Sequence, residues 1–484
     1  MKSSIEFVSK CGNHYLYDFN CNIGILLHPI LFNYIIEGYE IDEDNSILST
    51  YYKEKYQYLQ KHGFFQTYSF ERNISRLLSE QNIIYQMANT EQLTFEVTEK
   101  CNLDCSYCCY GDLYIHHKKR EKRSLDFNTA TSIIDFCFSL WNSEKNKSKK
   151  KNIFIGFYGG EPLLNFEVIE QIVNYVKNKD IYKRVHFTMT TNSILLDKYI
   201  DFLVVNNFQL LLSLDGNSSN NVYRKKKNGE NSFDLVCKNI DKLYKQYPIF
   251  FEQNVNFNAV LHNANSVEDI YCFIKNRYNK IPLLSELNTY GIANKKRKDF
   301  NNMYVNYENS ILSSAFKKEL ISNLFVSIPF YKDLIRFVLQ YFNIKKELQD
   351  LIRKDMMSSI PTGTCAPFAK KIFVSVEGEL FPCEKIERNH PLGKVINGKI
   401  EINLKEIVSY YNELYLNIRK QCKKCYFQKS CVQCLFNMST KKKKRYCNSS
   451  MDRNKFADYL SEKISTLEEN SSFIVKIINN IFLK

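Results

Sequence analysis

Three cysteines stand at Cys-x3-Cys-x2-Cys spacing directly after an alternating, strand-like run. One short loop can direct Cys101, Cys105 and Cys108 at a single metal centre. Soft thiolate ligands select iron-sulfur clusters or zinc, and a four-iron cluster with three protein ligands keeps one iron open for a small molecule. A closed zinc site would need a fourth thiol, which Cys109 could supply, and three buried structural cysteines are the remaining interpretation.

Glycines and polar residues follow the next strand-like runs. The second run leads into Gly-Gly-Glu-Pro at 159–162, where the glycines permit close backbone approach and Glu161 adds an acceptor. The third run ends at Asn192, and the fourth ends in Ser-Leu-Asp-Gly at 213–216, with Arg224 following. Hydroxyl, amide and guanidinium groups at neighbouring strand ends can bind ribose and carboxylate groups.

A second group of seven cysteines occupies the last third of the chain. It comprises Cys365, Cys383, Cys422, Cys425, Cys431, Cys434 and Cys447. Gly378 stands at the expected turn of a hairpin that leads into Cys383. Cys-x2-Cys pairs are the usual grip on zinc, so one or two zinc ribbons are one interpretation.

Strand-like runs alternate with helical ones from about residue 93 to residue 292, which is the pattern of parallel βα units. Six such runs occur, at 93–98, 153–158, 185–190, 209–214, 254–261 and 283–289. They predict an α/β fold with a partial (β/α)6 TIM-type barrel. Active sites in such barrels lie at the C-terminal ends of the strands, where the motifs above fall.

Residues 1–90 predict a small α+β domain without a cysteine cluster. Three short strands, a helix that Pro29 opens and a second helix at 51–62 suggest a winged-helix-like module. Such a module has an exposed strand edge at which a peptide can bind by adding a strand, although a structural cap is the alternative. The predicted parts are the module at 1–90, the barrel at 91–295, a helical bridge at 296–360, a cysteine-rich domain at 361–450 and a C-terminal helix at 451–484.

The first cysteine loop, with an aromatic residue before its last cysteine, resembles the signature of the radical S-adenosylmethionine (SAM) enzymes. The later motifs occur in that family's order. The resemblance implies a [4Fe-4S] cluster on Cys101, Cys105 and Cys108 whose open iron is chelated by the amine and carboxylate of SAM. It also implies that SAM is bound by Tyr107, Gly159, Gly160, Glu161, Asn192, Ser213 and Arg224. Within that set, Ser213 and Arg224 would contact the SAM carboxylate and Tyr107 would lie near the adenine.

The second group of cysteines resembles the SPASM domain, the auxiliary-cluster extension of radical SAM enzymes that modify peptides and proteins. Two residues precede the sixth cysteine where the consensus has three. The resemblance implies two auxiliary [4Fe-4S] clusters, the first on Cys365, Cys383 and Cys434 and the second on Cys422, Cys425, Cys431 and Cys447. The first would keep an open iron at which a substrate thiolate could dock, and the alternative is a fourth ligand from elsewhere, such as Cys272, or a water. Glu384 stands where sulfatase-maturing relatives carry an acidic proton acceptor, and a surface glutamate is the alternative.

The composition sets limits on the class of protein. The chain has 484 residues, 44% of them hydrophobic, which is enough for two or three domains. Its formal net charge is +15, but clusters with four thiolates are themselves negative, so the basic excess can be compensation and no nucleic-acid partner is expected. The 16 cysteines indicate metal in a cytoplasmic chain, and no signal peptide or membrane span is predicted.

Together these features predict a radical SAM peptide maturase. It would cleave SAM to a 5′-deoxyadenosyl radical and install a thioether, carbon-carbon or ether crosslink in a ribosomally synthesised precursor peptide, with a reductant such as flavodoxin or ferredoxin. The module at 1–90 resembles the leader-peptide recognition domains of such enzymes. The alternatives are a sulfatase-type maturase that forms formylglycine and, from another class, a zinc-rich, basic nucleic-acid-binding protein.

Overall fold

The computed structural model describes residues 4–19, 23–36, 47–65, 77–115, 121–147, 151–325, 327–341, 366–428, 431–441 and 444–482. The chain forms two compact units. The barrel unit consists of residues 78–329 and 365–411, and the terminal unit consists of residues 1–77, 330–364 and 412–484. Each unit is described by itself below.

The barrel unit is built on a ten-stranded sheet of order β11-β10-β8-β7-β6-β4-β12-β13-β14-β15. Six of its strands run parallel and form at the six runs that the sequence predicts. These are β4 (Gln92–Thr98), β6 (Ile153–Gly159), β7 (Val185–Thr191), β8 (Gln209–Ser213), β10 (Val255–Leu261) and β11 (Leu283–Glu286). The α/β prediction is therefore confirmed, and the carboxyl ends of these strands meet at one edge of the sheet.

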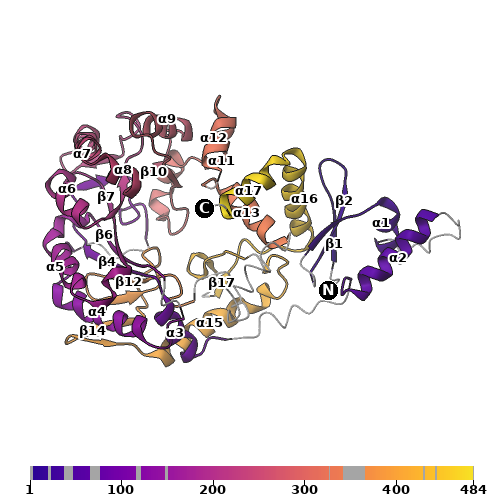
Figure 1. Ribbon diagram of the computed structural model, residues 1–484, viewed down its shortest axis with the longest axis horizontal. Helices are drawn as coiled ribbons and strands as arrows, with labels where there is room; N and C mark the ends of the chain where they lie inside the picture. The colour runs from indigo at the N-terminus through magenta and orange to yellow at the C-terminus, as the bar shows by residue number, and fades with distance from the viewer. Residues whose placement is uncertain are drawn as a thin grey trace. The chain divides into compact units, whose positions relative to one another are not determined.

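Helices connect the parallel strands, and Figure 1 shows α4 to α9 around β4, β6, β7 and β10. The helices of this unit are α3 (Glu80–Asn89), α4 (Phe127–Asn142), α5 (Phe166–Lys177), α6 (Leu196–Val205), α7 (Phe233–Gln246), α8 (Pro248–Asn254), α9 (Val267–Tyr278), α10 (Arg297–Met303), α11 (Tyr307–Leu312) and α12 (Lys317–Leu324). Short 3-10 turns occupy Pro162–Asn165, Asp180–Arg184 and Asn294–Lys296.

Alternation along β4 separates an apolar face from a polar one. Leu93, Phe95 and Val97 are completely buried, whereas Thr94 and Glu96 point to the opposite face because successive side chains of a strand alternate. The apolar face gives this strand its place in the core. The polar face is available for contacts with the segments that follow the strand ends.

The sheet continues beyond the six parallel strands into the second cysteine region. Its added strands are β12 (Ile372–Val374), β13 (Glu379–Phe381), β14 (Gly393–Ile396) and β15 (Lys399–Glu401). The predicted hairpin is present, with Gly378 at its turn at a φ of 73°, a conformation that glycine adopts without strain. Strand β12 pairs in parallel with β4, an extension of the sheet that sequence reasoning did not anticipate.

The terminal unit contains an antiparallel sheet of order β1-β2-β3, followed by two helices. The elements are β1 (Ser4–Val8), β2 (His14–Asp18), β3 (Ile23–Leu26), α1 (Pro29–Ile36) and α2 (Ile47–Lys61). Its later elements are α16 (Arg453–Glu469), α17 (Ser472–Phe482), the ribbon β16 (Ser439–Lys441) and β17 (Lys444–Tyr446), and a 3-10 turn at Leu435–Asn437. Helices α13 (Pro329–Tyr341) and α15 (Leu404–Cys422) span the residues at which the chain divides.

Helix α16 lies along the outer edge of β1, as Figure 1 shows. Its side chains bind the polar groups of that strand and of the turn after it. Arg453 donates to the Ser4 carbonyl at 3.1 Å, Ser461 donates to the Val8 carbonyl at 2.6 Å, and the Lys10 amide donates to Ser465 Oγ at 2.8 Å. The β1 edge is therefore covered.

Within the described residues, no helix has both the length and the apolar character needed to cross a membrane.

Candidate active site at the cysteine loop

The loop after β4 carries the first three cysteines and is held by a short strand pair. Strand β5 (Leu103–Cys105) pairs antiparallel with β9 (Arg224–Lys226), which places Cys105 opposite Arg224. The Cys108 amide then donates to the Cys105 carbonyl at 3.0 Å, which closes a tight turn between these two cysteines. The local backbone thus gives the predicted loop a defined shape.

The three thiols of this loop lie close enough to influence one another. The pKa of Cys105 is raised to about 12, chiefly by burial and also by Cys108 and Cys101, against the opposing effect of Arg224. A metal centre that binds here must displace protons from these thiols. In the part of the chain that the structure describes, no three His, Cys, Asp or Glu side chains are close enough to share a single metal ion.

Asn192, at the end of β7, reaches the cysteine loop. Its Nδ2 donates to Asn102 Oδ1 at 2.7 Å and lies 3.8 Å from Cys101 Sγ. The Asn192 amide in turn donates to Glu161 Oε2 at 2.7 Å, and Thr191 Oγ1 donates to Glu161 Oε1 at 2.7 Å. The carboxylate of the Gly-Gly-Glu-Pro turn therefore fixes the end of the neighbouring strand beneath the loop.

The glycines of this turn allow close packing on the end of β4. Gly159 has a φ of 139°, and a Cβ at this position would lie 2.3 Å from the Thr98 carbonyl oxygen. The Gly160 amide donates to the same carbonyl and the Glu161 amide donates to the Lys100 carbonyl, both at 2.8 Å. Only glycine fits the first position, because a side chain would push the turn away from the strand that leads into Cys101.

Arg224 is buried, although the sequence around it reads as a basic surface run. Arg224 is only 7% exposed, and its Nη2 lies 3.0 Å from Asp215 Oδ1. The guanidinium also lies over the Tyr107 ring, 5.5 Å from the centroid. Ser213 is buried at the end of β8 and pairs in register with Asn258 of β10. The structure thus brings Tyr107 and Arg224 together around a carboxylate beside the cysteine loop.

Two buried donors beside the loop have no hydrogen-bond partner among the described residues. These are Arg224 Nε and Asn102 Nδ2. Buried polar groups are normally satisfied, so these unpaired donors at a loop of three thiols suit a ligand that accepts hydrogen bonds. The donor set, three thiols with a guanidinium and an amide, fits an iron-sulfur cluster together with a carboxylate-bearing molecule.

Four of the later cysteines gather within the terminal unit. The pKa of Cys422 is raised to about 12, chiefly by burial and also by the nearby Cys431, Cys425 and Cys447. The Gln421 side chain donates to the Cys447 carbonyl at 2.7 Å and accepts from its amide at 3.0 Å, which fixes the last cysteine beside the end of α15. These are the four residues that the sequence groups as the second auxiliary set.

The other predicted set stays a prediction. Cys365 lies outside the described residues, Cys383 follows β13 in the barrel unit, and Cys434 belongs to the terminal unit. Glu384 is neither a free base nor an open surface residue. Its side chain is 18% exposed and its Oε2 lies 3.0 Å from Lys371 Nζ.

Sequence reasoning missed two buried charge pairs in the barrel unit. Asp215 belongs to the Ser-Leu-Asp-Gly motif, so its position in the sequence did carry a signal. Glu96 and Arg388 carried no such signal, because 292 positions of the sequence separate them. Arg388 Nη1 and Nη2 bind Glu96 Oε2 and Oε1 at 2.5 and 3.0 Å, and Nη2 also lies 3.3 Å from the Tyr110 hydroxyl.

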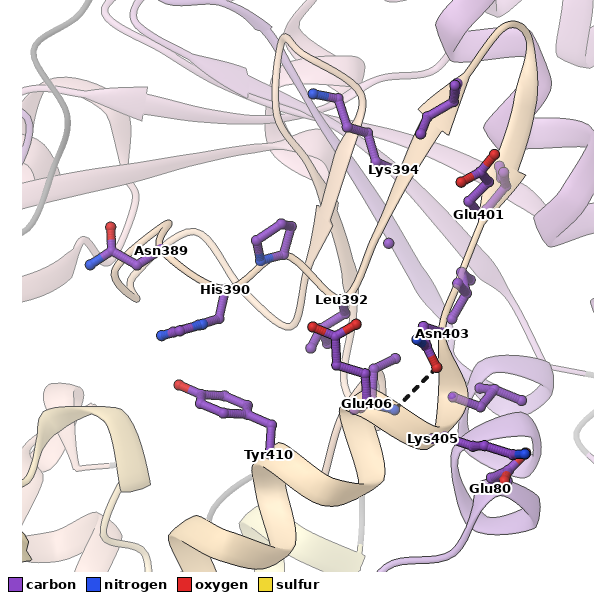
Figure 2. Close-up of a pocket in the computed structure, with 17 residues that line it drawn as sticks. Glu80, Asn389, His390, Leu392, Lys394, Glu401, Asn403, Lys405, Glu406 and Tyr410 are labelled. Carbon is purple, nitrogen blue, oxygen red and sulfur yellow. Dashed lines mark hydrogen bonds between the residues drawn. The ribbon is translucent and has the colours of Figure 1, made fainter.

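A cavity of about 1060 Å³ lies elsewhere in the barrel unit, beside the β14–β15 hairpin and the start of α15 (Figure 2). The rings of His390 and Tyr410, which line it, are tilted by 34° to each other, with centroids 4.6 Å apart. None of the predicted site residues is among the residues that line it. The three thiols and the buried ion pair lie at the cysteine loop and not in this cavity.

Comparisons with known proteins identify a family for the region that contains the first cysteine loop. Residues 95–273 match the family model described as the Radical SAM superfamily. An uncharacterised protein of Methanocaldococcus jannaschii is 28% identical over 66% of this chain and 93% of its own length. A cysteine-type anaerobic sulfatase-maturating enzyme of Clostridium novyi is 22% identical over 71% of this chain and 87% of its own length.

Two further proteins complete the comparison. A radical SAM cyclopropyl synthase of Paramaledivibacter caminithermalis is 28% identical over 40% of each chain. The solved structure of native anSMEcpe with bound AdoMet and Cp18Cys peptide covers 80% of this chain and 99% of its own, with 20% identity and a TM-score of 0.52. That likeness shows the shared fold.

Proposed function

Since this chain carries a radical SAM domain and is an enzyme of the radical SAM superfamily, we propose that it is a maturase that crosslinks a ribosomally synthesised precursor peptide. The observation that carries the proposal is the partly buried cysteine loop, beside which two buried donors, Arg224 Nε and Asn102 Nδ2, have no hydrogen-bond partner among the described residues. Relatives over most of the chain include enzymes that mature sulfatases, which are protein substrates. The crosslink would be a thioether, a carbon-carbon bond or an ether.

Cys101, Cys105 and Cys108 would each bind one iron of a [4Fe-4S] cluster. When bound, the cluster and SAM supply a 5′-deoxyadenosyl radical through reductive cleavage of SAM. Arg224 Nε and Asn102 Nδ2 would donate to the carboxylate of the ligand, and Ser213 stands at the end of the neighbouring strand. Asn192 would orient the loop, because it already bonds to Asn102 and approaches Cys101.

The later cysteines would hold two auxiliary [4Fe-4S] clusters. Support is strongest for the set that gathers in the terminal unit, Cys422, Cys425, Cys431 and Cys447. Cys365, Cys383 and Cys434 would hold the other, with one iron open to a substrate thiolate. Bond formation from a substrate radical releases one electron and one proton, and the auxiliary clusters would accept that electron. A flavodoxin or ferredoxin would supply the electron that cleaves SAM.

The experiment that tests the proposal changes Cys101, Cys105 and Cys108 to Ala together. We expect 5′-deoxyadenosine formation from SAM to cease, because no thiolate remains to hold the first cluster, while iron content falls by about four per chain. Cys109→Ala is the matched control and should retain both the iron and the activity, since Cys109 lies outside the motif. Formation of 5′-deoxyadenosine by the triple variant at the wild-type rate would disprove the assignment.

A sulfatase-type maturase that makes formylglycine is the second candidate, since sulfatase-maturating relatives match over more than two thirds of this chain. Its proton acceptor would be Glu384, which here pairs with Lys371 at 3.0 Å and would have to leave that partner to act as a base. Mass spectrometry of a co-expressed cysteine-containing peptide separates the two reactions. A thioether keeps the sulfur and loses two hydrogen atoms, whereas conversion of cysteine to formylglycine loses the sulfur.

A further inference from the structure

One buried carboxylate joins the segments that support the cysteine loop. Asp215 is completely buried, and it accepts hydrogen bonds from the Tyr107 hydroxyl, from Arg224 Nη2 at 3.0 Å and from the Val260 amide at 2.9 Å. These donors come from the loop itself, from β9 and from β10. Asp215 therefore connects three segments that lie far apart in the sequence.

A buried histidine supplies a fourth contact to this carboxylate. The Ala264 amide donates to His262 Nδ1 at 3.2 Å, and the Asn265 side-chain amide lies 3.1 Å from His262 Nε2. That nitrogen lies 3.7 Å from Asp215 Oδ2. Although burial raises the pKa of Asp215, Arg224, the nearby His262 and the hydrogen bond from Tyr107 hold that pKa below its usual range. The carboxylate is thus ionised and faces the guanidinium of Arg224.

The cation of this pair lies beside the loop that carries the thiols. Arg224 is the register partner of Cys105 in the β5–β9 pair, and its guanidinium lies over the ring of Tyr107, which directly precedes Cys108. Both members of the ion pair are at least nine-tenths buried, so water screens their charges little. Each charge can therefore act electrostatically on a metal centre bound by Cys101, Cys105 and Cys108.

We infer that Asp215 and Arg224 are positioning residues that fix the Cys105–Cys108 turn and set the reduction potential of the centre it holds, through two opposed charges. The inference rests on the proposed cluster at Cys101, Cys105 and Cys108. Reduction adds an electron to that centre, so a nearby anion disfavours reduction and a nearby cation favours it. The effects of the two charges on the reduction potential therefore offset each other, and removal of either charge alone would shift the potential.

The test compares three variants of the full chain with reconstituted clusters. Asp215→Asn removes only the anion and should shift the midpoint potential to a more positive value. Arg224→Met removes only the cation and should shift it to a more negative value. The double variant removes both charges, leaves no unpaired buried ion, and should return the potential toward that of the wild type.

The potential is measured by electron paramagnetic resonance in a redox titration without SAM, so that lost contacts to SAM do not enter. The relevant cluster is identified by the signal that changes when SAM is added to a separate sample. Asp241→Asn is the matched control, because Asp241 on helix α7 likewise pairs with an arginine and a tyrosine, Arg277 and Tyr278 on helix α9. It should not shift the potential.

The inference is overturned if both single variants shift the potential in the same direction, or if neither shifts it. A shift that arose from disorder of the turn would not change its direction with the sign of the charge that is removed. Should Asp215→Asn fail to hold the cluster, the double variant decides. If the double variant regains the iron, the loss in Asp215→Asn is due to the unpaired buried charge of Arg224, which supports the inference. If the double variant also fails to hold the cluster, the inference is overturned. The proposed function fails separately, through the triple cysteine variant.

Discussion

At the scale of single residues, the burial of Glu161 shows how the fold places a titratable group near the site. Its carboxylate is completely buried and accepts hydrogen bonds from Thr191, Asn192 and Leu163. Burial raises the pKa of Glu161 from 4.5 to about 7, although these three donors favour the charged form. The desolvation of the carboxylate thus outweighs its hydrogen bonds.

This shift makes a prediction about stability and pH. Between pH 4.5 and 7 the folded chain keeps a proton on Glu161 that the unfolded chain has lost, so the stabilisation is complete below pH 4.5 and is lost as the pH rises through 7. From pH 6 to pH 8 we expect a loss of about 1 kcal/mol from this group. The thermal unfolding midpoint of the wild type should fall over that range more than the midpoint of Glu161→Gln.

The control for this prediction is Glu230→Gln. Glu230 is exposed near β9, and its hydrogen bonds from Asn228 and Lys226 lower its pKa, so it is ionised throughout that range of pH. This variant should keep the slope of the wild type. Equal slopes for the wild type and Glu161→Gln would show that Glu161 does not titrate in this range.

At the scale of elements, the sheet of the terminal unit has one covered edge and one edge that no described residue pairs with. Helix α16 covers β1, whereas β3 is the last strand on the other side. The Leu27 amide donates to the His14 carbonyl, and alternation along the antiparallel ladder then turns the amides of Gly24 and Leu26 away from β2. Leu26 is 58% exposed. We propose this edge as the binding site for the leader of the precursor peptide.

Leu26→Pro tests this edge, because proline removes the outward amide and leaves the pairing with β2 intact. We expect leader affinity to fall by about 1 kcal/mol, roughly fivefold in Kd. Leu26→Thr keeps the amide with a side chain that suits a strand and serves as the control. Fluorescence anisotropy of a labelled leader peptide gives both affinities, and equal values would rule out strand addition at β3.

At the scale of the whole molecule, the number of clusters separates the classes of protein that the cysteines permit. Ten cysteines in two regions of the sequence are assigned here to three [4Fe-4S] clusters. Zinc ribbons would use the same Cys-x2-Cys pairs with a different metal. The net charge of +15 suits both interpretations, because it could offset thiolate clusters or favour nucleic acid.

Anaerobic reconstitution of the full chain should therefore give a brown protein with about twelve irons per chain. Iron and zinc are measured together by elemental analysis. The triple variant at positions 101, 105 and 108 should retain about eight irons, because its auxiliary clusters do not depend on the first loop. A colourless protein with about two zincs would instead support the nucleic-acid-binding class.

The sequence by itself determined the six parallel strands, the motifs at their ends and the two groups of cysteines. These features depend on local periodicity and on spacing within one loop, which a linear pattern records directly. Even the hairpin turn at Gly378 could be predicted, because its signal lies within a few neighbouring residues.

Only the tertiary structure decided which distant groups meet. The pairing of Glu96 with Arg388, the parallel addition of β12 to β4 and the covering of β1 by α16 join segments hundreds of residues apart. The burial of Arg224 against Asp215 turned an apparent surface run into part of the site. Such contacts depend on how the chain packs, and no local pattern encodes them, because the partners share neither a helix nor a strand.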